Sequence, residues 1–223
     1  MSDYIVASSR EWHRPAFERF AQSAPGIWHY VDTPEALTAA LGSISPRYIF
    51  FLHWSALVPA NVFEKHECVC FHMTDVPYGR GGSPLQNLIQ LGKTETVMSA
   101  LRMEKALDAG PVYGKRPFSL QGRAEEIYLR AGELCWEMVR RIVDTQPTPV
   151  PQQGEATPFR RRTPEQSALP TSGELSRLFD YIRMLDAPGY PLAFVQHGDF
   201  RLELSHAELS GDELLARVSI RKI

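Results

Sequence analysis

Arg47-Tyr-Ile-Phe-Phe-Leu-His53 and Glu67-Cys-Val-Cys-Phe-His72 are the two stretches of this sequence that decide its fold. Each is a short, nearly continuous apolar run that ends in a histidine. Strands that are buried on both faces of a parallel sheet have this continuous pattern, whereas half-exposed strands alternate between apolar and polar residues. The two stretches therefore predict strands inside an α/β sheet.

Helices and further strands alternate with these two stretches along the first two thirds of the chain. Thr33-Pro34-Glu35 has the cap, the proline and the acidic first turn of a helix start, and Gly42 marks the end of that helix. The other predicted elements are a helix carrying Phe17 and Phe20, a helix from Ser83 to Gly92, a long amphipathic helix from about Gly122 to Val143, and strands at Tyr4–Ser8, Val97–Met103 and Val112–Leu120.

Composition changes at Asp144, and this change divides the chain into three predicted parts. Residues 1–144 form an α/β domain, and residues 145–159 form a proline-rich, extended linker. Residues 160–223 form a small C-terminal subdomain with a basic run, one helix and three short antiparallel strands. The predicted fold class is α/β, a mostly parallel sheet flanked by helices, with a small C-terminal α+β appendage.

Charge and composition restrict the partners that the chain can have. Its 223 residues include 24 Lys+Arg and 26 Asp+Glu, a formal net charge of -2, which argues against binding nucleic acid by bulk electrostatics. The longest apolar run, Tyr48 to Leu52, is too short to cross a bilayer, and the first residues lack the pattern of a signal peptide. The three cysteines are too few for a disulfide framework, so we expect a cytoplasmic protein.

His72 and Asp108 are the residues best placed for acid–base chemistry. His72 ends an apolar strand, at the sheet edge where open α/β folds bind ligands. Asp108 lies in a turn between two predicted strands, where a carboxylate often only caps the turn. A strand-end histidine is likewise often bonded to a backbone carbonyl. Together, however, the two side chains can converge in a cleft as an acid–base pair.

A zinc site is the alternative explanation for this strand. His66, Cys68, Cys70 and His72 alternate along it, so all four side chains can share one face. The two ends lie roughly 20 Å apart at about 3.3 Å per residue, which is too far for one ion. Neighbours two apart on a strand also diverge, which disfavours a Cys70–His72 nucleophilic dyad. We therefore expect buried apolar thiols and no metal.

Two further motifs have a functional and a purely structural explanation. The loop Gly79-Arg-Gly-Gly-Ser-Pro84 leads into a helix N-terminus and can form a backbone wall for a ligand, but its spacing fits neither a Walker A loop nor a dinucleotide motif. The run Arg160-Arg161-Arg162 is either a solvated stretch or a fork that grips a phosphate or carboxylate.

Cys70-Phe-His-Met-Thr-Asp-Val-Pro-Tyr-Gly-Arg-Gly-Gly-Ser-Pro84 resembles the core segment of the formyltransferases that use 10-formyltetrahydrofolate. Gly92 to Met103 is similar to the next segment of that family, and Ala106-Leu-Asp-Ala-Gly-Pro111 is similar to its Leu-Asp-x-Gly motif. The three segments follow one another in register without a gap.

The resemblance extends on both sides of this core, over roughly residues 45–205. Arg47 to Pro59 resembles the family's preceding strand and the loop that lines its folate pocket. Arg161 to Ser167 and Ile182 to Pro191 look like the C-terminal part of the amino-sugar formyltransferases. The resemblance implies a Rossmann-like formyltransferase domain and an enzyme that transfers a formyl group from 10-formyltetrahydrofolate to a primary amine.

The family's central residues are an Asn-His-Asp trio, and this sequence departs from it at one position. His72 matches the histidine and Asp108 the aspartate, but Cys70 stands where the family has asparagine. A thiol is a weaker hydrogen-bond donor to a developing oxyanion than an amide. We expect His53, at the end of the adjacent strand, to replace the missing donor as a third catalytic residue; Thr74 and Asn87 are the other candidates.

The resemblance also implies which residues bind the two substrates. The formyl donor is expected at Leu57, Pro59, Asp108, Ala109, Gly110 and Pro111. The amine substrate is expected at Trp54, Thr74, Tyr78, Gly81, Gly82, Asn87, Arg161 and Arg162.

The acceptor is expected to be a small amine, because the tRNA-directed relatives carry an additional basic domain for which 223 residues leave no room. The tail favours a nucleotide-linked amino sugar over glycinamide ribonucleotide. A hydroxyornithine, an aminoacyl carrier, or folate binding without turnover are the alternatives, the last because of Cys70. The open edges of the predicted C-terminal strands favour a homodimer.

Overall fold

The computed structural model describes all 223 residues and separates into two compact units. The first unit comprises residues 1–80, 97–118 and 129–158, and the second comprises residues 81–96, 119–128 and 159–223. The second unit therefore takes two segments from the region that the sequence assigns to the α/β domain. The three-part division at residues 144 and 159 stays a prediction.

A six-stranded, mostly parallel sheet forms the centre of the α/β fold, which confirms the predicted fold class. In space the strand order is β2-β1-β3-β4-β6-β7. The first four strands in this order, β2, β1, β3 and β4, pair in parallel. β4 then pairs with β6 in an antiparallel ladder. The strands are β1 (Asp3–Ala7), β2 (Ile27–Val31), β3 (Tyr48–Phe51), β4 (Cys68–His72), β6 (Glu95–Arg102) and β7 (Val112–Ser119).

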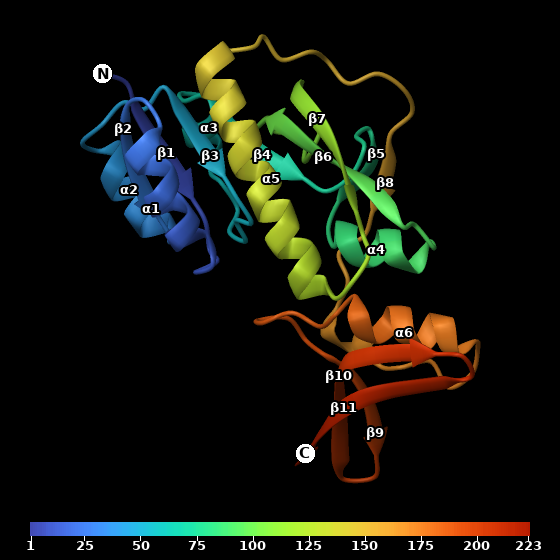
Figure 1. Cartoon of the computed structure of the whole chain (residues 1–223). Helices are drawn as coiled ribbons and strands as arrows, with labels where there is room; N and C mark the ends of the chain where they lie inside the picture. The colour runs from blue at the N-terminus through green and yellow to red at the C-terminus, as the bar shows by residue number, and fades with distance from the viewer. The chain divides into compact units, whose positions relative to one another are not determined.

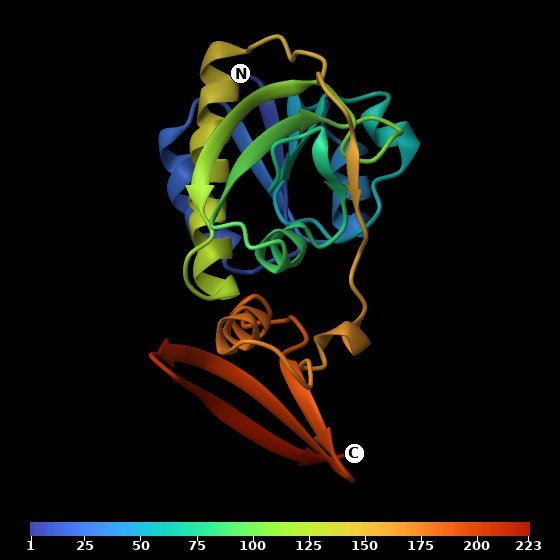
Figure 2. The ribbon, with the colours of Figure 1, turned by 90° about the vertical axis from the view of Figure 1, so that its right-hand side faces the viewer.

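Helices cover both faces of this sheet (Figures 1 and 2). On one face, Phe20 of α1 (His13–Ser23) contacts the Trp28 ring of β2 and the Trp136 ring of α5 (Ala124–Thr145). On the other face, Leu37 of α2 (Pro34–Leu41) and Val62 of α3 (Ala60–Phe63) join the buried cluster that contains the side chains of alternate residues of β1, β3 and β4. No helix combines the length and the apolar character that crossing a membrane requires.

The glycine-rich stretch expected as an irregular loop instead forms a strand, so that part of the prediction is wrong. β5 (Tyr78–Gly81) pairs with β8 (Thr157–Phe159), a short strand in the segment expected as a linker. Gly81 makes this pairing sterically feasible: its φ is +112°, and a Cβ there would lie 2.3 Å from the Phe159 carbonyl oxygen. The pairing depends on residues about eighty positions apart, which local sequence patterns do not reveal.

The second unit contains the predicted C-terminal helix and three antiparallel strands, in the order β11-β10-β9 (Figure 2). Gln86 of α4 donates to the Met184 carbonyl at 3.0 Å, which joins the segment 81–96 to the end of α6. The elements of this unit are α4 (Pro84–Gln90), a 3₁₀ turn η1 (Pro164–Ser167), α6 (Leu175–Arg183), β9 (Ala193–His197), β10 (Phe200–Ser210) and β11 (Glu213–Lys222).

Candidate active site

The structure brings His72 and Asp108 together in the first unit. His72 is the last residue of β4, and its Nδ1 lies 3.6 Å from Oδ2 of Asp108. Only 9% of the His72 side chain and 12% of the Asp108 side chain are exposed. A separation of 3.6 Å is an ion-pair distance rather than a tight hydrogen bond, as is common before a substrate is bound. The pair has the composition and burial of an acid–base site, and its catalytic role stays a prediction.

The two nitrogens of the His72 ring have different partners. Nε2 lies 2.7 Å from the carbonyl oxygen of Gly79. A carbonyl oxygen can only accept, so Nε2 carries a proton and donates it to this bond. Nδ1 faces the Asp108 carboxylate and is the nitrogen that remains for chemistry. The backbone-carbonyl partner considered from the sequence is thus present, alongside the contact with the carboxylate.

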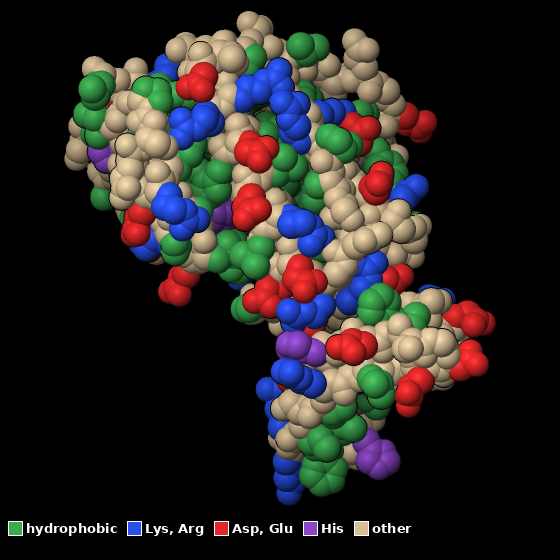
Figure 3. Space-filling view, in the orientation of Figure 1, with side chains coloured by type: hydrophobic (Ala, Val, Ile, Leu, Met, Phe, Trp, Pro, Cys, Tyr) green, Lys and Arg blue, Asp and Glu red, His purple; other side chains and the backbone are tan.

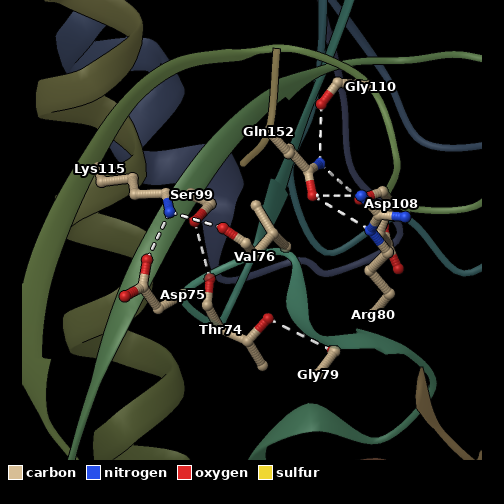
Figure 4. Close-up of polar contacts among 10 residues, drawn as sticks. All are labelled: Thr74, Asp75, Val76, Gly79, Arg80, Ser99, Asp108, Gly110, Lys115 and Gln152. Carbon is tan, nitrogen blue, oxygen red and sulfur yellow. Dashed lines mark hydrogen bonds and ion pairs between the residues drawn. The ribbon is translucent and has the colours of Figure 1, made fainter. Parts of the chain in front are cut away.

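Hydrogen bonds around Thr74 fix the segment that follows β4 (Figure 4). The buried hydroxyl of Thr74 donates to the Gly79 carbonyl at 3.3 Å, and the Thr74 carbonyl accepts from the Ser99 hydroxyl at 2.7 Å. Lys115 bonds both the Asp75 carboxylate and the Val76 carbonyl. The contacts of Thr74 are therefore those of a residue that shapes the loop, and its expected contact with the substrate stays a prediction.

Asp108 occupies a backbone conformation that requires support. Its φ of +52° lies in the left-handed region, which is unfavourable for residues other than glycine. Two residues further on, Gly110 passes so close to β6 that a Cβ on it would lie 1.8 Å from the Arg102 carbonyl oxygen. Gln152 then bonds the carbonyls of both Asp108 and Gly110, each at 2.8 Å (Figure 4). The sequence analysis missed Gln152, because a glutamine in a proline-rich stretch gives no local signal of its partners.

The Cys70 thiol is not suited to act as a nucleophile. Burial, and secondly the negative charge of nearby Asp108, raise the pKa of Cys70 far above its usual range. Burial likewise raises the pKa of Cys68 to about 12. Because the thiolate is the reactive form, both groups stay as protonated thiols at neutral pH. These pKa directions agree with the sequence-based preference for inert thiols.

His53, the expected replacement for the missing asparagine, is bonded to a second histidine. Its Nδ1 lies 2.8 Å from Nε2 of His13, a residue that the sequence analysis did not single out. Burial, followed by the nearby His13, lowers the pKa of His53 to about 3, and burial lowers the pKa of His13 to about 4. Both rings are therefore neutral at pH 7, and the N–H of one ring donates a hydrogen bond to the bare nitrogen of the other. A catalytic role for His53 stays a prediction.

The neutral histidine pair predicts a loss of stability in acid. Because both folded-state pKa values lie below the unfolded value of 6.5, the unfolded chain binds extra protons as the pH falls from 6.5 towards 4. The stability contributed by the neutral pair is complete above pH 6.5 and is lost as the pH falls. Asparagine is chosen to replace His53 because it tolerates the positive φ of 47° at this position. His53→Asn should reduce the slope of the unfolding free energy against pH by about 1.4 kcal/mol per pH unit between pH 6 and 4.5.

Urea denaturation at several pH values measures this slope. His197→Asn is the matched control, because it makes the same substitution at an exposed histidine of β9. An unchanged slope in His53→Asn would show that the pair does not resist protonation.

The loop expected to hold the formyl donor presents apolar surface to solvent. Leu57 is 91% exposed, and Pro59 is exposed at the start of α3. Trp54 is half-buried against Phe51, with their ring centroids 5.8 Å apart, and its buried indole nitrogen has no hydrogen-bond partner. The exposed leucine is apolar surface of the kind that a bound heterocyclic ligand covers.

Several residues expected to contact the amine lie in the second unit, where they contact one another. The Asn87 amide donates to the carbonyls of Gly82, Ser83 and Arg160. The Arg162 guanidinium bonds the side chain of Gln90 and the Gln166 carbonyl. Gly82 packs against Arg161, since a Cβ on the glycine would lie 2.5 Å from the arginine Cβ. Arg161 itself is exposed. Of the two arginines expected at the phosphate, Arg162 is thus occupied by contacts within the protein.

Comparisons with known proteins show the family of this chain. The family model for the methionyl-tRNA formyltransferase C-terminal domain matches residues 164–221. The solved structure of a methionyl-tRNA formyltransferase from Clostridium thermocellum is 39% identical, with a TM-score of 0.96 over 100% of both chains. The chain belongs to the formyltransferase family. The family resemblance seen in the sequence is thereby confirmed.

More distant solved structures share the fold. A 4-N formyltransferase from Francisella tularensis is 15% identical with a TM-score of 0.75, over 94% of this chain and 98% of its own. HypX from Aquifex aeolicus, solved in complex with tetrahydrofolic acid, is 18% identical with a TM-score of 0.74, over 92% of this chain and 37% of its own.

Curated relatives of this formyltransferase chain are longer than the chain itself. The methionyl-tRNA formyltransferase of Campylobacter curvus is 25% identical over 179 residues, which are 78% of this chain and 59% of the relative. The chain spans about half to three fifths of the length of the first such relatives.

Proposed function

We propose that this chain is an N-formyltransferase that moves the formyl group of 10-formyltetrahydrofolate to the primary amine of a small, nucleotide-linked amino sugar. The observation that carries the proposal is the buried His72–Asp108 pair at the end of β4, in a chain of the formyltransferase family. All three cysteines are free thiols, in keeping with a cytoplasmic enzyme.

The chemistry assigns different tasks to the two side chains. Bound 10-formyltetrahydrofolate supplies the formyl carbon that the neutral amine attacks. His72, anchored through Nε2 to Gly79, donates from Nδ1 to the formyl oxygen as negative charge develops there. Asp108 holds the ring in the state with a proton on Nδ1 and accepts the proton that the amine loses. As the bond between the formyl carbon and N10 breaks, this proton passes to N10, and tetrahydrofolate leaves.

The residues of the first unit fit a folate-type donor. Exposed Leu57 offers apolar contact to a pterin ring. The relative HypX binds tetrahydrofolic acid on the same fold. We propose that Leu57 and Pro59, together with the turn from Asp108 to Pro111, hold the donor, as the resemblance implies.

The amino-sugar acceptor is supported by some of the relatives that match this chain over nearly their whole length, a group that also includes the methionyl-tRNA formyltransferase from Clostridium thermocellum. The 4-N formyltransferase from Francisella tularensis matches over 98% of its own chain. A protein from Shewanella that is described as a sugar N-formyltransferase matches over 100% of its own chain. On the face drawn in Figure 3, basic and acidic side chains are interspersed over the larger, upper part. This mixture suits a small acceptor better than a polyanion. We propose Arg161, which is exposed, as the residue that meets the phosphates of the acceptor.

Two other functions each rest on a specific observation. Methionyl-tRNA is the second candidate acceptor, because the 39% identical relative from Clostridium thermocellum is named for that activity. Folate binding without turnover is favoured by Cys70, whose protonated thiol is a weak donor at the position of the family's asparagine.

A formyl-transfer assay separates these functions. Purified protein is given 10-formyltetrahydrofolate with UDP-, dTDP- and CMP-linked amino sugars, with hydroxyornithine, with an aminoacyl carrier protein, and with methionyl-tRNA, and the formylated product is measured by mass spectrometry. We expect product from a nucleotide-linked sugar. Product only from methionyl-tRNA, or only from another amine, would contradict the proposed acceptor. Folate binding by calorimetry without any product would contradict formyl transfer itself.

A further inference from the structure

The side chain of Gln152 uses its full hydrogen-bonding capacity to join the backbone of the Asp108 turn to the side chain of Arg80 (Figure 4). Its amide nitrogen donates to the carbonyls of Asp108 and Gly110, each at 2.8 Å. Its amide oxygen accepts from Nε of Arg80 at 3.1 Å and from Nη2 at 2.8 Å. A carboxamide has two N–H donors and one oxygen with two lone pairs, so all four are used. We call this set of four bonds the Gln152 clasp.

The two segments that the clasp joins are those that hold the His72 ring. Arg80 directly follows Gly79, whose carbonyl accepts the bond from Nε2. Asp108 supplies the carboxylate that faces Nδ1. The clasp therefore links the backbone that carries Asp108, on one side of the imidazole, to the side chain of Arg80, the residue that follows Gly79 on the other side. If either segment moved, the distance between the two oxygens that flank the ring would change.

The Asp108 turn needs such a link because local structure does not hold it. Asp108 has a positive φ, and the residues before it, from Glu104 to Leu107, are exposed. A turn of this kind keeps an unfavourable conformation only where tertiary contacts fix it. Gln152 itself is fixed by its neighbour Val150, whose backbone N–H and carbonyl both pair with Val112 of β7, at 2.9 and 2.8 Å.

We propose that Gln152 is a positioning residue of the proposed formyl transfer, which holds the Asp108 carboxylate and the Gly79 carbonyl at fixed places on either side of His72. Only the kinetic consequence of this inference rests on the proposed function. It also means that the segment expected as a plain linker completes the site. The clasp acts on catalysis through Asp108 and His72 and does not itself touch the reacting atoms.

Two substitutions test the clasp, with a matched neighbour as control. Gln152→Ala removes all four bonds. Gln152→Glu keeps the shape and the bond to Arg80 but places an oxygen against the two carbonyls, so it removes only the donors. Gln153→Ala is the control, because Gln153 is exposed and adjacent in sequence. We expect kcat to fall about 10- to 100-fold in both Gln152 variants, as for a displaced catalytic group, while KM for the amine changes less than about threefold.

A second measurement does not depend on turnover. The ¹⁵N and ¹H signals of the His72 ring, recorded by NMR at pH 7, should move in Gln152→Ala and in Asp108→Asn, and should stay in place in Gln153→Ala. Ring signals that move in Asp108→Asn but stay in place in both Gln152 variants would overturn the inference. The inference would also be overturned if the Gln152 variants had a lower unfolding temperature but unchanged kcat and unchanged ring signals, because Gln152 would then have a structural role only. If the wild type formylates no amine, the proposed function fails while the ring signals still decide the role of Gln152.

Discussion

Asp108→Asn is expected to lower kcat for formyl transfer by about 10²–10⁴, while the protein remains folded. The substitution keeps the size of the side chain but removes the charge that faces Nδ1 of His72 at 3.6 Å. Without it, the amine loses its proton acceptor, and the imidazole loses the partner that keeps a proton on Nδ1. Asparagine tolerates the positive φ of 52° better than alanine does, so the change tests chemistry rather than backbone strain.

Steady-state kinetics with the acceptor found in the substrate panel measure this effect, and circular dichroism checks the fold. Asp144→Asn is the matched control, because Asp144 is an exposed carboxylate in the last turn of α5 and should leave kcat unchanged. Near-normal turnover in Asp108→Asn would remove Asp108 from the catalytic pair and leave the proposed mechanism without a base.

The sequence contained enough to predict the central sheet, and the reason is physical. The runs ending at His53 and His72 are continuously apolar because both faces of β3 and β4 are covered, and burial on both faces leaves a pattern that can be read locally. Thr33 caps α2 by accepting from the Ala36 N–H, as its position before Pro34 predicts. Where a single segment determines its own environment, the prediction was confirmed.

The contacts that the sequence could not show are those in which two distant segments determine each other. β2, with Ile27 47% exposed, lies at the edge of the sheet and lacks the continuous apolar pattern. The His13–His53 pair spans forty positions, and the bonds from Gln152 to Arg80 and Asp108 span 72 and 44. Glutamine and histidine are common on surfaces, so only their partners show that these side chains have a role.

The sequence predicts the site only in part, because some of its contacts join distant segments. The family motifs place His72 and Asp108 because each lies at the end of a recognisable element, and the structure brings the two within 3.6 Å. The motifs do not show how a residue with positive φ is held in place. The turn that carries Asp108 depends on the Gln152 clasp on one side and on the absence of a side chain at Gly110 on the other.

Gly110→Ala is therefore expected to cause a large loss of stability in the first unit. The added Cβ would lie 1.8 Å from the Arg102 carbonyl oxygen, and this neighbour is β6 backbone rather than a flexible side chain. Either β6 or the turn must move. We expect the free energy of unfolding in urea to fall by about 3 kcal/mol, at the upper end of the range for overpacking. The same displacement would move Asp108, so kcat should fall as well.

Gly114→Ala separates this steric effect from the general effect of adding a methyl group. Gly114 lies in β7 with no positive φ, and the nearest atom to a new Cβ is the end of the Arg141 side chain at 4.0 Å. Its unfolding free energy should change by less than about 0.5 kcal/mol. Equal stabilities for the two variants would mean that the turn relaxes without cost. In that case the position of Asp108 would not depend on the close approach of Gly110 to β6, and the Gln152 clasp alone would have to hold the carboxylate beside His72.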